Sequence, residues 1–259
     1  MSSIVKIGVL HLLPLPGSPS GTVDFPKVLQ RALADASAVM KGGMDGFIIE
    51  NFGDAPFLAD RVPPHVPSMM AIVADRLRQI YPNAFIGINV LRNDASAAVA
   101  VATAAQADFI RVNVHTGSAW TDQGLIHGQA YKTLVYRKSL GSTIQLAADI
   151  LVKHAQPAGI SDLSLVAKDT FYRGKADIII LTGFQTGSTT DVTEVEACRL
   201  AVPQAQIWIG SGVTPSNVAN YIGFADGVIV GSYLHEEGDL QKPLSQQRVE
   251  NICNALRYS

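Results

Sequence analysis

Eight short apolar runs alternate with eight helical segments along the chain, and this alternation constrains the fold more than any other feature. The strand-like runs lie at residues 4–10, 46–50, 84–90, 108–114, 143–152, 177–181, 207–209 and 227–230. They are nearly continuous in Val, Ile and Ala, as in strands buried on both faces. Strict alternation predicts a parallel sheet, and eight units predict its closure. We therefore expect an α/β protein, a single-domain (β/α)8 TIM barrel with a parallel closed sheet over residues 1–259.

The helical segments are expected at residues 24–41, 68–80, 94–106, 126–138, 161–173, 192–202 and 245–256, with one short helix that begins at Thr214. Asp24, Asp94, Ser161 and Asp191 are suitable N-cap residues for four of them. Long loops follow the first, second, fourth and sixth strands, whereas the loops that return from helix to strand are short. Barrel enzymes place their chemistry at the carboxyl ends of the strands, so we expect function at the end with long loops.

Composition excludes several classes of protein. Apolar residues make up 47% of the chain and charged residues only 16%, so a large core can be buried. The net charge of −2 and the lack of a Lys/Arg block argue against a nucleic-acid partner. No apolar run reaches about 18 residues, so no membrane span is expected. Cys198 and Cys253 lie far apart in the sequence and lack the spacing of zinc ligands, which favours a reducing, cytoplasmic location. No metal and no cofactor is predicted.

Strand parity predicts which side chains point into the barrel. Ile110, Val112 and Val114 alternate with Arg111 and Asn113, so the apolar set should face the helices and the polar set the barrel mouth. The same reasoning applied to the other strands gives the predicted catalytic residues, which are Glu50, Arg111, Asn113, Asp149 and Lys153. Half-buried charged groups are costly without partners. These five side chains could divide substrate orientation and general acid and base work, or Arg111 could form a structural ion pair with Glu50 or Asp149.

The last two strand-like runs each end in a step of glycine and serine, Gly210-Ser211-Gly212 and Gly231-Ser232. Glycine lets backbone N–H groups approach a ligand closely, and barrels often bind phosphate on the loops after their last two strands. We therefore expect Ser211, Gly212, Gly231 and Ser232 to bind phosphate. The alternative is that these glycines only make tight turns.

Other polar and aromatic side chains have simpler interpretations. His11 and His115 follow the first and fourth strands, where hydrogen bonds to neighbouring backbone are the default. Asp169 and Arg173 have the i,i+4 spacing of a surface pair on a helix. Trp120 either covers a ligand or packs its own loop.

Several long motifs resemble the BtpA family, which includes SgcQ-like proteins. They are IGVLHLLPLPGSP at residues 7–19, GGMDGFIIENFGDAPF at 42–57, GINVLRNDASAAVAVA at 87–102, FIRVNVHTGSAWTDQGLIHG at 109–128, LVKHA at 151–155, IGSGVTPSNV at 209–218 and ADGVIVGS at 225–232. The resemblance covers nearly the whole chain and implies a barrel of the ribulose-phosphate-binding type. It also implies a Lys at the position of His235, where this sequence departs from the family pattern.

Two functions from different classes remain open. In the first, the protein binds a small phosphorylated metabolite, a sugar phosphate or nucleotide-like compound, and performs isomerase or lyase chemistry. In the second, which the family resemblance implies, it is a non-catalytic factor for photosystem I biogenesis that contacts photosystem I subunits and lies peripherally on the cytoplasmic face of thylakoids in a cyanobacterial host. Phe52 and Phe57 in a mouth loop are consistent with a homo-oligomer or with packing over the barrel.

Overall fold

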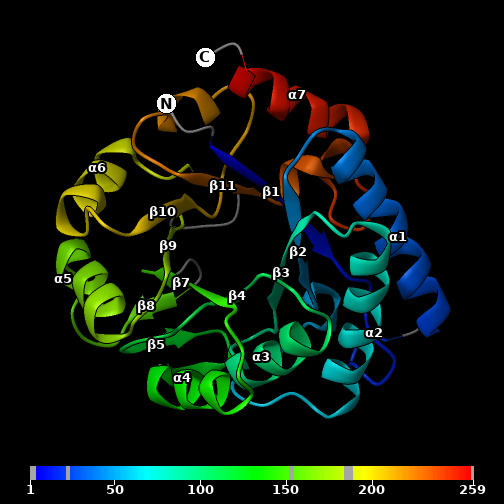
Figure 1. The fold of residues 1–259 in the computed structure, drawn as a ribbon, viewed down its shortest axis with the longest axis horizontal. Coiled ribbons are helices and arrows are strands. Elements are labelled where there is room, and N and C mark those ends of the chain that lie inside the picture. Colours follow the sequence, from blue (N-terminus) through cyan, green and yellow to red (C-terminus); the bar gives the residue numbers. More distant parts are fainter. Residues whose placement is uncertain (1–3, 22–23, 152–154, 184–188, 258–259) are drawn as a thin grey trace.

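The computed structural model describes residues 4–21, 24–151, 155–183 and 189–257. Its centre is a closed barrel of eight parallel strands in the order β1-β11-β10-β9-β7-β4-β3-β2 (Figure 1). The strands are β1 (Val5–His11), β2 (Gly46–Glu50), β3 (Phe85–Asn89), β4 (Phe109–Val112), β7 (Gln145–Ile150), β9 (Ile178–Leu181), β10 (Gln206–Ile209) and β11 (Gly227–Val230). Pairing of β1 with both β2 and β11 closes the ring, which confirms the predicted fold class.

Helices surround this barrel. They are α1 (Phe25–Lys41), α2 (His65–Ile80), α3 (Ala95–Ala104), α4 (Ala130–Ser139), α5 (Leu163–Lys168), α6 (Val192–Ala201) and α7 (Gln246–Arg257). Asp24, Asp94 and Asp191 cap α1, α3 and α6 through their carboxylates, as predicted. The cap of α5 is Asp162 and not Ser161, because the Asp162 carboxylate accepts from the amide of Leu165 at 2.8 Å. A π-helical turn, η2 (Asp169–Arg173), continues α5.

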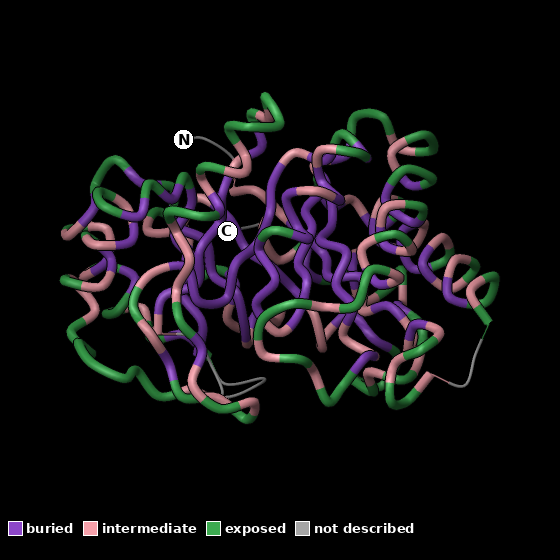
Figure 2. Tube along the Cα trace, turned by 90° about the horizontal axis from the view of Figure 1, so that it is seen from below, coloured by how far each residue is buried: buried purple, intermediate pink, exposed green. Residues whose placement is uncertain are grey.

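Two apolar layers result from strand alternation, and Figure 2 shows the buried centre in purple. One side of each strand packs on the helices. The other side fills the barrel, where Phe109 packs against Phe85 and Trp208 with ring centroids 5.0 and 5.4 Å apart. Smaller apolar side chains of β1, β2, β7, β9 and β11 complete this interior cluster. The barrel interior near the amino ends of the strands is therefore a packed core. Polar groups line the interior at the carboxyl ends of the strands.

The loop after β4 differs from the prediction. Residues 115–124 were expected to be irregular and residues 126–138 helical, but the chain forms a hairpin of β5 (Ser118–Thr121) and β6 (Gly124–His127) before α4 begins at Ala130. A further strand, β8 (Ala155–Pro157), pairs antiparallel with β5. The resulting three-stranded sheet lies beside the barrel between α4 and α5 (Figure 1).

The segment after β10 also differs, because no helix begins at Thr214. Residues 215–217 form turns, followed by a 3₁₀ helix, η3 (Val218–Tyr221). The Asn217 side chain spans the turn, accepting from the Thr214 amide at 2.8 Å and donating to the Gly212 carbonyl at 2.7 Å. These local side-chain bonds replace the first bonds of a regular helix. Three further short turns are η1 (Phe52–Asp54), η4 (Ser232–Leu234) and η5 (Glu236–Gly238).

Candidate active site at the barrel mouth

The carboxyl ends of the strands surround a cavity of about 350 Å³. Three polar residues on adjacent strands lie in one register at this end of the barrel, because His11 of β1 pairs with Glu50 of β2, and Glu50 pairs with Asn89 of β3; His11 and Glu50 line the cavity. The Asn89 amide donates to Oε2 of Glu50 at 2.8 Å. Glu50 is 7% exposed and lines the cavity. A carboxylate at this position is desolvated but still reachable by a small molecule.

Arg111 and Asp149 form a buried bidentate ion pair across β4 and β7. Nε and Nη2 of Arg111 donate to the two carboxylate oxygens of Asp149 at 2.9 and 3.0 Å. Asn113 adds a third bond to Asp149 at 3.0 Å. Burial alone lowers the pKa of Arg111, but the charge and hydrogen bonds of Asp149, helped by the charge of Glu50, outweigh this effect and raise the pKa of the guanidinium. Arg111 is therefore a fixed cation at the floor of the cavity.

The ends of β10 and β11 form the opposite wall. Gly210 and Gly231 face inward without side chains, and a Cβ on Gly210 would lie 3.4 Å from an Arg111 guanidinium nitrogen. Within the described residues, the amides of Ser211, Gly212 and Ser232 donate to no protein acceptor. The Ser211 hydroxyl accepts from the amide of Gly183 at 2.7 Å, which fixes this turn. Donors left available beside a buried cation make the wall suited to an oxyanion.

The rim of the cavity contains side chains that the sequence analysis did not single out as polar candidates. Arg92 follows β3, lines the cavity and lies 3.4 Å from an Asp122 oxygen on the β5–β6 turn. Asp122 is more than half exposed, so this second cation is only partly neutralised. Phe52 and Phe57 close one side, with ring centroids 6.4 Å apart. Glu50 is the last residue of β2, whereas Arg92 lies beyond the end of β3, where strand parity makes no prediction.

The remaining sequence candidates are placed as follows. His115 is buried and its Nε2 lies 2.8 Å from the Gly174 carbonyl, as expected for a structural histidine. His11 instead contacts the side chain of His235. Asp169 and Arg173 form an exposed pair at 3.8 Å, which confirms the prediction for them. Lys153 lies outside the described residues.

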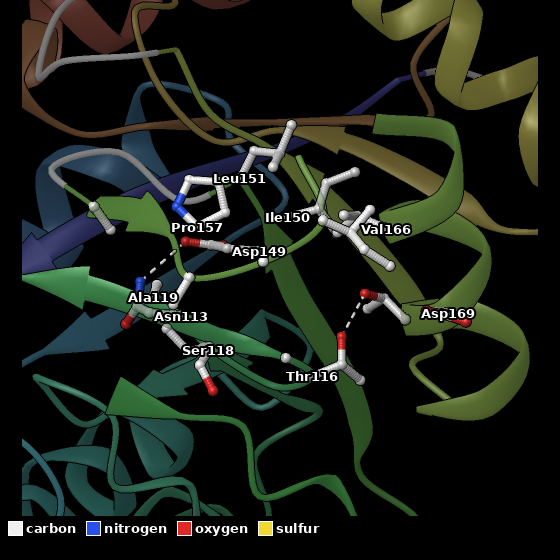
Figure 3. Close-up of a pocket in the computed structure, with 17 residues that line it drawn as sticks. Asn113, Thr116, Ser118, Ala119, Asp149, Ile150, Leu151, Pro157, Val166 and Asp169 are labelled. Atoms are coloured by element: carbon white, nitrogen blue, oxygen red, sulfur yellow. Dashed lines mark hydrogen bonds between the residues drawn. The ribbon is translucent and has the colours of Figure 1, made fainter. Parts of the chain in front are cut away.

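A second cavity of about 280 Å³ lies beside the mouth, between the β5 strand and α5. Figure 3 shows that Asn113 and Asp149 border it on one side and Val166 and Asp169 on the other. Thr116 crosses to Thr170 through a 2.8 Å hydrogen bond between their hydroxyls. Asn113 lines both cavities, so the polar cluster around Asp149 separates them.

Two further findings concern metals and membranes. Among the described residues, no group of three or more His, Cys, Asp or Glu side chains is arranged to hold a metal ion. Within the same residues, every helix is too short or too polar to cross a bilayer.

Comparison with known proteins gives consistent results for sequence and fold. A family model described as BtpA family matches residues 3–258. Photosystem I biogenesis protein BtpA of Synechocystis is 45% identical over 96% of this chain and 87% of its own length. An uncharacterized protein of Pyrococcus abyssi is 40% identical over 97% of this chain and 95% of its own. A solved structure described as native KDPGal covers 100% of this chain and 97% of its own with a TM-score of 0.62, and its 16% identity shows the fold alone.

Proposed function

Since the chain belongs to the BtpA family and folds as a (β/α)8 barrel, we propose that it binds a small phosphorylated metabolite and performs acid/base chemistry on it. The metabolite is a sugar phosphate or a nucleotide-like compound, and the reaction is of the isomerase or lyase type. One observation carries the proposal, namely the available amides of Ser211, Gly212 and Ser232 among the described residues, since Ser211 and Ser232 line a cavity that Arg111 also lines.

The phosphate is bound by the backbone of Ser211, Gly212, Gly231 and Ser232. Peptide N–H groups bind a phosphate without the desolvation cost of a lysine ammonium, and Arg111 supplies the compensating charge nearby. The positive φ of Gly212, 69°, turns the chain so that consecutive amides can converge on one anion. A phosphate held there would leave the rest of the cavity, toward Glu50, for the carbon skeleton.

Arg111 and Asn113 orient the oxygens of the substrate, and Glu50, Asp149 and Lys153 are the candidates for proton transfer. The contacts of the two carboxylates divide these roles further. Asp149 accepts three hydrogen bonds, two of them from Arg111, so its main role is to hold Arg111 in place. Among the residues that the structure describes, Glu50 accepts one side-chain hydrogen bond, from Asn89, and it borders the cavity. Glu50 is therefore the better proton acceptor of the two carboxylates.

A thermal-shift titration with inorganic phosphate and ribose 5-phosphate tests the proposal. We expect both ligands to raise the unfolding temperature of the wild-type protein. A Gly212→Asp variant should lose this shift, because its carboxylate repels the anion. Gly141→Asp is the matched control, since Gly141 also has a positive φ, 62°, with open space around it in the loop before β7. An undiminished shift in Gly212→Asp would exclude the proposed phosphate site.

The alternative function is that of a photosystem I biogenesis factor, and the 45% identity to the Synechocystis protein of that name favours it. The presence of a relative in Pyrococcus abyssi indicates that the property shared by the family is not tied to photosystems. The two functions are separated by co-purification from a cyanobacterial host. Photosystem I subunits that co-purify equally with the wild type and with a Glu50→Gln variant would favour the assembly role.

A further inference from the structure

A second arginine at the barrel mouth carries a charge that the protein pairs only weakly. Arg92 follows β3 and lines the same cavity as Ser211, Ser232 and Arg111. Its side chain is only 12% exposed. Within the part of the chain that the structure describes, its guanidinium forms one ion pair, in which Nε lies 3.4 Å from a carboxylate oxygen of Asp122. Among the same residues this guanidinium donates no hydrogen bond to a protein acceptor, so its N–H groups are available to a ligand.

The carboxylate that faces Arg92 is poorly placed to hold it. Asp122 lies at the turn of the β5–β6 hairpin, its side chain is 55% exposed, and its other oxygen accepts from the Gln123 side chain at 2.9 Å. An ion pair with so exposed a partner is screened by water and contributes little. Arg111 differs, because the Asp149 side chain that accepts two of its hydrogen bonds is 0% exposed. An incoming anion can therefore displace Asp122 from Arg92, whereas Asp149 stays on Arg111.

The order of the strands places Arg92 across the barrel from the proposed phosphate wall. In the ring β1-β11-β10-β9-β7-β4-β3-β2, β3 is the fourth strand from β10 in either direction. A ligand whose phosphate lies at the ends of β10 and β11 therefore has to cross the mouth to reach Arg92. The two strands beside β3 are β2 and β4, and their residues Glu50 and Arg111 line the cavity that such a ligand crosses.

The surroundings of Arg92 favour an anion over a neutral group. The peptide N–H of Arg92 donates to the Leu58 carbonyl at 3.1 Å, which fixes the backbone from which the side chain extends. Phe52 and Phe57 line the same cavity, and their rings exclude water that would screen the charge. Among the described residues, Glu50 forms no ion pair with Arg92. A guanidinium offers two parallel N–H groups, a geometry that matches a carboxylate or a phosphate.

We propose that Arg92 binds a second anionic group of the substrate, a carboxylate or a phosphate, at the opposite end from the phosphate bound by Ser211, Gly212 and Ser232. The substrate is then a phosphorylated compound with two anionic ends, and a sugar phosphate with one neutral end binds less well. Asp122 competes with the ligand for Arg92, which determines specificity and transfers no proton. The inference rests on the proposed function, because the phosphate wall is the other anchor of the same substrate.

Isothermal titration calorimetry of the full chain with two matched pairs of compounds tests the proposal. The first pair is 6-phosphogluconate and sorbitol 6-phosphate, which differ by a terminal carboxylate. The second is fructose 1,6-bisphosphate and fructose 6-phosphate, which differ by a second phosphate. In at least one pair, we expect the wild type to bind the doubly anionic compound about 10- to 100-fold more tightly. The pair with the larger ratio identifies the second group.

The failure of this inference is distinguishable from the failure of the proposed function. Equal affinities within both pairs, or no binding of any of the four compounds by a protein that binds inorganic phosphate, would overturn the inference alone. A protein that does not bind inorganic phosphate would overturn the proposed function, and the inference with it.

Three variants assign the effect to Arg92. Arg92→Met keeps the apolar stem but removes the charge, so it should lose the preference for the doubly anionic compound and bind the singly anionic one unchanged. A preference retained in folded Arg92→Met would refute the proposal. Arg173→Met is the matched control, because Arg173 is 84% exposed on η2 and does not line this cavity.

The third variant, Asp122→Asn, removes only an exposed carboxylate and decides the question even if Arg92→Met does not fold. Without its competitor, Arg92 should bind the doubly anionic compound about two- to fivefold more tightly than in the wild type. The affinity for the singly anionic compound should stay the same. An unchanged or weaker affinity for the doubly anionic compound would overturn the proposal.

Discussion

Replacing Asp149 by Asn tests the buried ion pair at the floor of the site. The substitution removes the negative charge that compensates Arg111, while the side chains keep nearly the same shape. The exposed fractions of the Arg111 and Asp149 side chains are 5% and 0%, so solvent cannot replace the lost partner. Removing one partner of such a pair typically costs about 3–5 kcal/mol, because the other charge is left buried. Glu50 also compensates Arg111 in part, which favours the lower half of that range.

The expected change in unfolding temperature follows from the size of the chain. At roughly 2.1 cal/mol/K per residue, 259 residues give an unfolding entropy of about 540 cal/mol/K, so a cost of about 3–4 kcal/mol should lower the melting temperature of the Asp149→Asn variant by about 6–7 °C. Calorimetry or circular dichroism measures this shift. Asp169→Asn is the control, because the pair of Asp169 and Arg173 is 3.8 Å apart and largely exposed. Its loss should cost less than about 1 kcal/mol.

A small effect would refute the reasoning. If Asp149→Asn melts within about 2 °C of the wild type, Arg111 does not depend on Asp149 for its charge compensation. The double variant Arg111→Met, Asp149→Leu should be more stable than Asp149→Asn, because neither of the two positions then holds a buried charge without its partner. A double variant less stable than the single one would show that packing, and not charge, dominates at this position.

Two further predictions concern titration and reactivity. Burial lowers the pKa of His115 and His235, so below about pH 6.5 the unfolded chain binds protons that the native state does not. The free energy of unfolding should therefore decrease by up to about 1.4 kcal/mol for each histidine and each unit by which the pH is lowered. Burial raises the pKa of Asp35 and Asp54, so these carboxyls make the native state more stable as the pH falls, opposite to the histidines. The variant His115→Gln isolates the histidine contribution, and its free energy of unfolding in urea should depend less steeply on pH between 7.5 and 5.5 than that of the wild type. An equal slope in the variant and the wild type would contradict the prediction. Burial also raises the pKa of the Cys198 thiol to about 12. This cysteine should therefore resist alkylation by iodoacetamide at pH 8 until urea unfolds the chain. Rapid labelling of Cys198 in the native protein would contradict this prediction.

Strand parity correctly predicted that Glu50, Arg111 and Asn113 reach the barrel mouth. The alternation of Ile110 and Val112 with Arg111 placed the apolar pair against the helices and the guanidinium inside, as the structure has them. The sequence left open whether Arg111 pairs with Glu50 or Asp149. Both carboxylates have the right parity, and the choice depends on which strands are neighbours and at what register. The β4–β7 pairing, with Arg111 opposite Ala147, brings Asp149 into reach.

Other features depended on contacts that local patterns do not contain. The β5–β6 hairpin begins in a polar segment, and its third strand, β8, comes from a separate loop, so tertiary pairing overrode the helical expectation around Ile126. Nothing near His235 indicates that it meets His11, because the contact requires closure of the barrel through β1 and β11. The sequence thus predicts elements and faces well, and it predicts side-chain partners poorly where chain segments far apart meet.

The most direct test of the phosphate site is a crystal structure of this protein soaked with inorganic phosphate. The account predicts tetrahedral density whose oxygens lie within about 2.7–3.2 Å of the amide nitrogens of Ser211, Gly212 and Ser232. Tetrahedral density only elsewhere, or these three amides bonded to protein acceptors in the presence of saturating phosphate, would contradict it.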